Sequence, residues 1–159
     1  MRIWLVICLL LLAGGVCGCS DHRQEEESAL RQQVERYTRL LAEGYVKFDM
    51  SGLRDVITPN HEARLEHRLN GLKMAKRRME SKLRKLDYLG VTFETDKPAK
   101  QRMATVRTRE VWDVRQVDPV SGKTEKEIQG LTYLLDYQFL QVDDRWLIED
   151  VVVLEDTSP

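Results

Sequence analysis

Cysteine is confined to the first residues of this 159-residue chain, which has Cys8, Cys17 and Cys19 and none beyond. The rest of the chain can form neither a disulfide nor a zinc site built on thiolates. It also has no thiolate nucleophile. A domain built from it must be held together by its hydrophobic core alone.

The chain also has few histidines, almost no net charge and no glycine-rich loop. The chain has three histidines and a net charge of −1. His61 and His67 are six positions apart, whereas two ligands on one helical face are three or four apart. We therefore expect both to be solvated and no metal to bind. No glycine-rich phosphate loop and no supported Ser–His–acid set occurs, and a near-neutral chain does not attract nucleic acid. We expect no cofactor and no nucleic-acid partner.

The N-terminus combines Arg2, an uncharged apolar run over residues 3–13, and Val-Cys-Gly-Cys at positions 16–19. A basic start, a short apolar segment and small residues are typical of a secretory signal. The stretch resembles the lipobox of bacterial lipoproteins, in which an aliphatic and two small residues precede an obligatory cysteine. The resemblance implies cleavage after Gly18 and lipid on Cys19. The residue after the lipidated cysteine is Ser20 and not aspartate, which resembles lipoproteins sorted to the outer membrane.

The resemblance implies an exported outer-membrane lipoprotein that faces the periplasm, with plasma-membrane anchoring as the alternative. An uncleaved anchor over residues 3–19 is a further alternative, although that length is at the short edge of what spans a bilayer. We expect a signal peptide over residues 1–18, a lipidated cysteine and polar tether over 19–27, and one domain over 28–155. About 140 residues suit a single domain.

Two helices are predicted in the first half of this domain. The first has an apolar stripe at helical spacing, formed by Leu30, Val34, Tyr37, Leu41, Tyr45 and Phe48. Ser51 and Gly52 break it, and Thr58 followed by Pro59 is a typical helix start. From there a long helix is predicted to about Leu86, with a stripe of Leu65, Leu69, Leu72, Met79, Leu83 and Leu86.

The second half changes to the alternating period of strands. Strands are predicted over residues 88–95, 103–117, 131–142 and 145–154, with turns at 96–98, 118–123 and 143–144. Helices first and strands later predict an α+β fold. In it, N-terminal helices pack on a curved antiparallel meander of about four strands.

Two stretches are similar to the NTF2-like superfamily. Residues 43–53 with Thr58 and Pro59 resemble the helix, break and Thr-Pro with which such domains begin. Residues 133–139 and 143–148 resemble the family's final hairpin, in which a polar turn precedes Trp-x-Ile. The long basic helix departs from that pattern. The resemblance implies a sheet curved round a pocket, in a family that includes enzymes, ligand binders and membrane-anchored assembly domains.

Strand alternation brings a few polar side chains toward that concave face. Glu110 on one strand and Asp150 on another are predicted to meet there, near Tyr133 and Tyr137. Two acids in a partly dry pocket can share acid–base work. The alternative is that both acids lie at the pocket mouth or bond to nearby backbone. One bulge in either strand would turn its acid outward.

A basic face on the long helix is the second candidate site. It comprises Lys73, Lys76, Arg77, Arg78, Lys82, Arg84 and Lys85. Such a face can dock on anionic lipid or on an acidic protein surface; the alternative is an ordinary solvated face. We expect a non-catalytic binding or assembly module of the cell envelope, tethered through Cys19, with a protein partner there. The alternative is a ligand binder or acid–base enzyme that uses the concave pocket.

Overall fold

The computed structural model of the protein describes residues 18–94 and 102–157, without the side chains of residues 18–21. The signal-like segment 1–17 and the predicted turn at 96–98 therefore lie outside the described residues. The elements are α1 (Gly18–Lys47), η1 (Ser51–Leu53), α2 (Pro59–Met74), β1 (Arg78–Glu94), β2 (Met103–Val117), β3 (Thr124–Val142) and β4 (Arg145–Thr157). No helix in this described part is both long and apolar enough to cross a bilayer.

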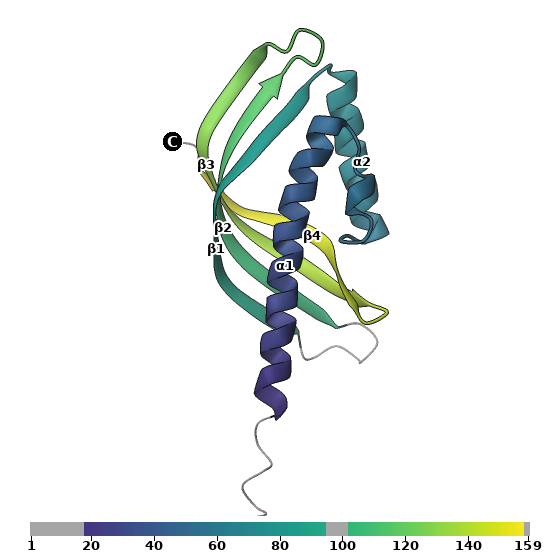
Figure 1. Ribbon diagram of the computed structural model, residues 1–159, viewed down its shortest axis with the longest axis vertical. Helices are drawn as coiled ribbons and strands as arrows, with labels where there is room; N and C mark the ends of the chain where they lie inside the picture. Colours follow the sequence, from purple (N-terminus) through teal and green to yellow (C-terminus); the bar gives the residue numbers. More distant parts are fainter. Residues whose placement is uncertain (1–17, 95–101, 158–159) are drawn as a thin grey trace, which may run out of the picture.

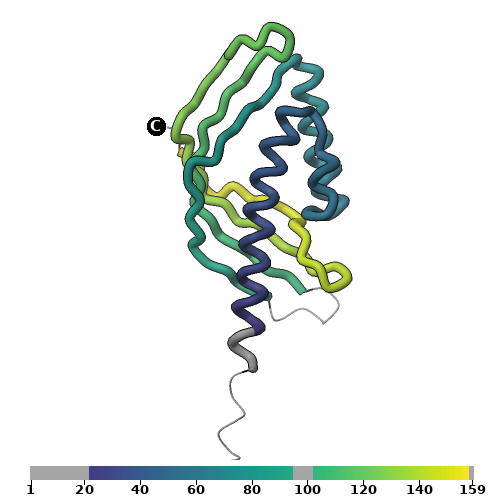
Figure 2. The backbone as a smooth tube through the Cα atoms, viewed as in Figure 1, coloured from purple at the N-terminus to yellow at the C-terminus, as the bar shows by residue number. Residues whose placement is uncertain are grey.

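The predicted α+β fold is confirmed, with two helices on one side of a four-stranded antiparallel sheet (Figure 1). The strands follow the order β1-β2-β3-β4. Bulges interrupt the register of each pairing, and bulges bend strands. One lies on β3 at Gln129 and Gly130, opposite Asp113. Gly130 has a φ of 71° and donates its N–H to the Asp113 carboxylate at 3.1 Å. Figure 2 shows the resulting bend, which curves the sheet round α1.

Helix α1 packs its predicted apolar stripe against the sheet. Leu30, Val34 and Tyr37 are buried, and the remainder of the stripe is partly buried against the same core. The helix begins earlier than predicted, so the tether expected up to residue 27 is wrong for the described residues. The charged residues of that segment form ion pairs one helical turn apart, such as Arg23–Glu27 at 3.5 Å, which support a helix.

The start of α1 is also fixed to the sheet. The guanidinium of Arg102, just before β2, donates two hydrogen bonds to the carboxylate of Glu26, at 2.9 and 3.0 Å. A paired bond of this kind fixes orientation as well as distance. Arg23 lies over the ring of Phe93 at 5.4 Å. These two contacts hold the N-terminal part of α1 against the sheet at Arg23 and Glu26.

The long helix predicted from Pro59 to Leu86 is wrong, because α2 ends at Met74. Its predicted cap is confirmed: the Thr58 side chain accepts from the N–H of His61 at 3.4 Å. At the other end, Lys76 takes a left-handed φ of 52°. Its N–H bonds to the Lys73 carbonyl, and the next N–H bonds to the carbonyl five residues back. This is a Schellman cap, with lysine where glycine is usual.

Strand β1 begins at Arg78, directly after this cap, and it contains the apolar residues Met79, Leu83 and Leu86 that were expected on the helix. Leu83 pairs with Trp112, and Leu86 pairs with Glu110. The bulge between them inserts one residue, so both side chains face the helices.

The segment 48–58 connects α1 to α2 and runs beside β4. There Ile148 exchanges backbone hydrogen bonds with Val56 and Thr58.

Candidate functional site

Glu110 is the most deeply buried acid of the described residues, with no exposed surface. Its carboxylate accepts three hydrogen bonds: from the Tyr137 hydroxyl at 2.7 Å, the Trp112 indole N–H at 2.7 Å and the Thr108 hydroxyl at 3.0 Å. Burial raises the pKa of Glu110, and the three donors partly counteract that rise. The acid is thus engaged by the protein itself.

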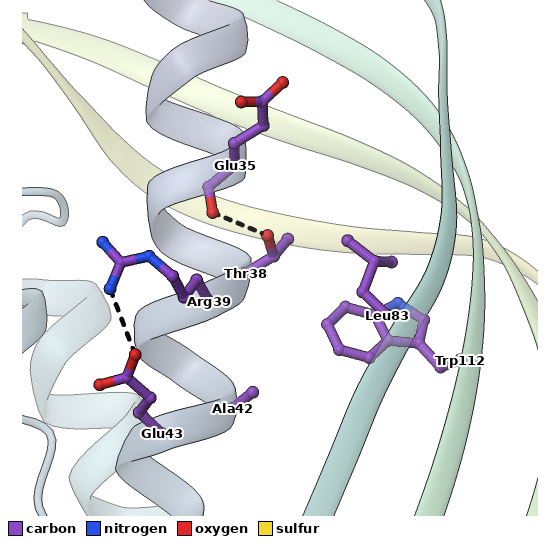
Figure 3. Close-up of a pocket in the computed structure, with 7 residues that line it drawn as sticks. All are labelled: Glu35, Thr38, Arg39, Ala42, Glu43, Leu83 and Trp112. Atoms are coloured by element: carbon purple, nitrogen blue, oxygen red, sulfur yellow. Dashed lines mark hydrogen bonds and ion pairs between the residues drawn. The ribbon is translucent and has the colours of Figure 1, made fainter.

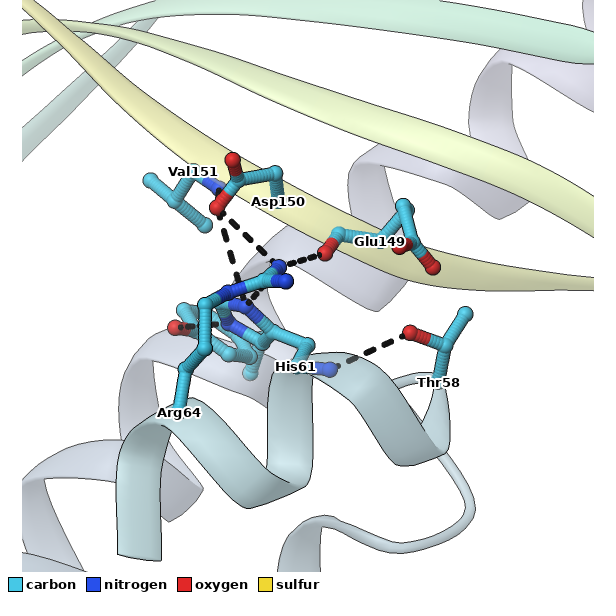
Figure 4. A network of polar contacts seen from close by, with 7 residues as sticks. Thr58, His61, Arg64, Glu149, Asp150 and Val151 are labelled. Atoms are coloured by element: carbon cyan, nitrogen blue, oxygen red, sulfur yellow. Dashed lines mark hydrogen bonds and ion pairs between the residues drawn. The ribbon is translucent and has the colours of Figure 1, made fainter. Parts of the chain in front are cut away.

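Asp150 does not meet Glu110, so the predicted acid pair is wrong. Glu149 is the extra residue of a bulge, because Ile148 pairs with Phe139 and Asp150 pairs with Gln138. The inserted residue reverses the alternation, and Val151 packs against the core where Asp150 was expected. Figure 4 shows Asp150 beside Arg64 of α2. Its side chain is 45% exposed and lies 3.3 Å from the Arg64 guanidinium.

The two tyrosines predicted with these acids both lie beside Glu110. Tyr137 is buried, and burial raises its pKa well above the usual value. Tyr133 is partly buried and lies directly opposite Glu110 in the β2–β3 pairing. Glu110, Tyr133 and Tyr137 therefore lie close together on neighbouring strands, while Asp150 lies elsewhere, so the four residues form no common site.

His61 is buried, and the expectation that it is solvated is wrong. Its Nε2 lies 2.9 Å from the Tyr37 hydroxyl, and Arg64 lies 3.2 Å from Nδ1. Burial lowers the pKa of His61 to about 4, with a further contribution from the Arg64 charge. The sequence held a signal for this position, since His61 precedes Leu65 and Leu69 at helical spacing on the buried face. His67 is exposed, as expected.

An open groove of about 340 Å³ lies between α1 and the sheet (Figure 3). It is lined by Glu35, Thr38, Arg39, Ala42, Glu43, Leu83 and Trp112. In Figure 3, Leu83 and Trp112 face Thr38 and Ala42 across the hollow. The surface of the groove is almost entirely apolar. The sequence prediction missed this groove because it placed Leu83 on a helix.

The polar groups around the groove already have partners. The Thr38 hydroxyl bonds to the Glu35 carbonyl at 3.0 Å, and the Trp112 indole donates to Glu110. Glu43 lies between Arg39 and Lys47, each at 3.2 Å, and the Lys47 hydrogen bond lowers its pKa most. A ligand in the groove would therefore contact apolar side chains at its floor and ion-paired side chains at its rim.

The predicted basic face does not exist as a helical surface. Lys73 lies on α2, Lys76 and Arg77 form the turn, and the remaining four members lie on β1. Several are ion-paired: Arg77 with Glu125, Arg78 with Glu80, Arg84 with Asp113 and Lys85 with Asp87. The basic residues are therefore spread over α2, the turn and β1, and these ion pairs neutralise most of them.

Metal ligands are not gathered anywhere in the described ranges 18–94 and 102–157: no cluster of three or more histidine, cysteine or acidic side chains is placed to hold an ion. Every buried side-chain nitrogen or oxygen described there has a hydrogen-bond partner.

Comparison with known proteins identifies a protein of similar fold. No family model matches the chain, and no curated protein is a significant match. Among solved structures, the crystal structure of the intermembrane space region of chloroplast protein ARC6 matches with a TM-score of 0.62. It is 18% identical, and the match covers 79% of this chain and 93% of that one. At this identity the likeness shows the fold alone, and membership of the NTF2-like superfamily stays a prediction.

Proposed function

We propose that this protein is a membrane-anchored, non-catalytic binding module of the cell envelope, exported and held to the outer membrane by lipid on Cys19. The observation that carries the proposal is the contrast between Glu110, saturated by three internal donors, and a groove lined by carbon. Catalysis needs a group that is free to move a proton or attack a substrate. The groove presents no such group, and the acid–base alternative loses its pair of acids.

The occupant that suits the groove is a bulky apolar side chain from a partner protein. Protein interfaces combine an apolar, well-packed centre with a charged rim. Here Leu83 and Ala42 belong to the centre, while Arg39 and Glu43 belong to the rim. A small-molecule site would instead bring a few polar groups together to orient its ligand.

Location in the envelope is supported by the signal-like N-terminus and, more loosely, by the fold. The similar ARC6 domain is named for an intermembrane space, so a related fold occurs in a compartment next to membranes. Attachment to a membrane would raise the effective concentration of the module for partners in that membrane. A module of modest affinity could then work at low abundance.

Blocking the groove tests the binding proposal. Ala42→Trp fills the hollow from α1, and Ala29→Trp adds the same side chain at an exposed position of the same helix. Both full-length variants are expressed in the native cell, and proteins crosslinked to them in the envelope are compared. We expect Ala42→Trp to lose partners that Ala29→Trp retains. Identical crosslinked sets from the two variants would rule the groove out.

Lipidation is tested separately with Cys19→Ala. We expect the variant to lose the mass of the lipid and to leave the membrane fraction, whereas Cys17→Ala should behave like the natural chain. Unchanged mass and membrane retention for Cys19→Ala would show that Cys19 does not carry the anchor. That outcome would leave the groove proposal to its own experiment.

A further inference from the structure

We propose that the outer edge of β4, over residues 151–157, binds an extended, positively charged segment of a partner protein as a fifth strand. This inference goes beyond the groove, which lies on the concave face beside β1 and β2. Strand β4 is at the opposite edge of the sheet. The two surfaces can therefore be tested independently.

The first part of the β4 edge is already covered by the chain itself. Ile148 donates its N–H to the Val56 carbonyl at 2.9 Å and accepts from the Thr58 N–H at 3.0 Å. The Arg64 guanidinium donates to the carbonyl of Glu149 (Figure 4). Within the described residues, no segment continues this cover beyond Asp150, so the edge opens there.

The register of β4 determines which backbone groups point outward. In an antiparallel pair, alternate residues direct their N–H and C=O groups to the neighbouring strand and away from it. Because Ile148 points outward, the pairings with β3 place Val151, Val153 and Asp156 outward too. The N–H of Val151 bonds to the Asp150 carboxylate at 3.0 Å. Val153 and Asp156 are left to pair with an added strand.

The open edge has the side chains of a pairing surface. Val153 is 55% exposed and Leu154 is 42% exposed, at the end of a run of three valines that favours strand structure. Exposed edges are normally protected by charged side chains, above all lysine, by proline or by bulges. The other edge strand, β1, carries four basic residues, whereas residues 151–157 contain no basic residue and no proline. Only a bulge at Leu154 interrupts the edge.

Charge selects a basic occupant over a second copy of this chain. Glu155 and Asp156 are exposed, and neither forms an ion pair with another described residue. If two copies paired their residues 151–157 about Leu154, the two Glu155 carboxylates would become diagonal neighbours. Like charges across strands destabilise pairing, whereas opposite charges stabilise it. A segment with lysine or arginine near these acids satisfies both the edge and its charge.

The test uses the full chain in detergent micelles and a short synthetic peptide that alternates threonine and lysine. Amide hydrogen exchange is measured at Val153 and Asp156. We expect the lysine peptide to slow exchange there by roughly tenfold, equivalent to about 1.4 kcal/mol. The matched peptide with glutamate in place of lysine should leave exchange unchanged. Equal protection by both peptides, or by neither, would overturn the proposal.

Two variants test whether the backbone makes the contact. Val153→Pro removes an outward N–H without taking a hydrogen bond from the β3 pairing, and Val153→Thr keeps that N–H. We expect protection at Asp156 to persist in Val153→Thr and to vanish in Val153→Pro. Persistence in both, or protection that grows with protein concentration when no peptide is present, contradicts the proposal. The latter would identify a second copy as the occupant. Ala42→Trp should leave these results unchanged, which separates this proposal from the groove.

Discussion

Removing the Glu110 side chain should cost the protein much of its stability. In Glu110→Ala, the hydroxyls of Thr108 and Tyr137 lose their acceptor while fully buried. Each buried donor left unpaired costs about 1–3 kcal/mol, so the two together cost about 2–6 kcal/mol. Trp112 is left out of this sum, because its side chain is only partly buried. Since domains are typically stable by about 5–15 kcal/mol, the variant should be marginal.

Glu110→Gln is the matched variant for titration, because it keeps the shape of the side chain and an acceptor oxygen for Thr108 and Tyr137, while its amide nitrogen no longer accepts from Trp112. Burial raises the folded-state pKa of Glu110 above its unfolded value. The folded protein therefore favours the neutral acid, and this contribution is complete below the unfolded pKa, about 4.3. It is lost as pH rises through the folded pKa. We expect the unfolding free energy of the natural protein, relative to Glu110→Gln, to fall as pH rises above about 4.3.

Urea unfolding followed by tryptophan fluorescence measures both effects, on chains that begin at Gly18 and carry Cys19→Ser. The measurements are repeated across the acidic and neutral pH range, and the difference between the two chains isolates Glu110 from other carboxylates. A loss below about 1 kcal/mol in Glu110→Ala would show that its hydrogen bonds are not those of a buried, satisfied acid. A pH-independent difference from Glu110→Gln would refute the raised pKa.

Three further outcomes follow from contacts elsewhere in the molecule. The ring protons of His61 should titrate near pH 4 by NMR. The contribution of His61 to stability is complete above its unfolded pKa and should be lost as pH falls toward about 4. Titration near 6.5 would contradict the burial of His61. Lys76→Gly should stabilise the protein by about 1 kcal/mol in thermal unfolding, because glycine takes the left-handed φ without strain, whereas an unchanged or lower midpoint would argue against the cap. Arg102→Ala should speed amide exchange at the start of α1, because Glu26 loses its partner; unchanged exchange would show that packing alone holds that end.

The long-helix error shows how a bulged strand can imitate a helix. An alternating strand would place apolar residues two apart, but the bulge after Leu83 makes the next inward residue Leu86. The spacing of three, following one of four from Met79, matches a helical stripe. The cap that ends α2 carried no glycine to reveal it. Both signals pointed to one continuous helix, although the chain turns at Lys76.

Elsewhere, local chemistry was sufficient. The strand predicted over residues 103–117 matches β2, and the left-handed φ values of Asp143 and Asp144 confirm the tight turn before β4. Thr58 caps α2 because its hydroxyl reaches an N–H within the same segment. The candidate acid pair failed for a different reason. Its geometry depended on the phase of β4, which a single inserted residue at Glu149 reversed, and no feature of the sequence marks that insertion.

The attachment of α1 to the sheet bears on where this domain can reach. Cys19 and Ala42 are on the same helix, 23 residues apart, which corresponds to about 35 Å at 1.5 Å per residue. A flexible tether would let the groove take many positions relative to the membrane. A helix held to the sheet by the Arg102–Glu26 pair instead limits the distance of the groove from Cys19 and its orientation. With lipid on Cys19, α1 would act as a rigid standoff. A partner rooted in the same membrane would then need a stalk of comparable length to reach the groove, and a partner arriving from the opposite side would need none.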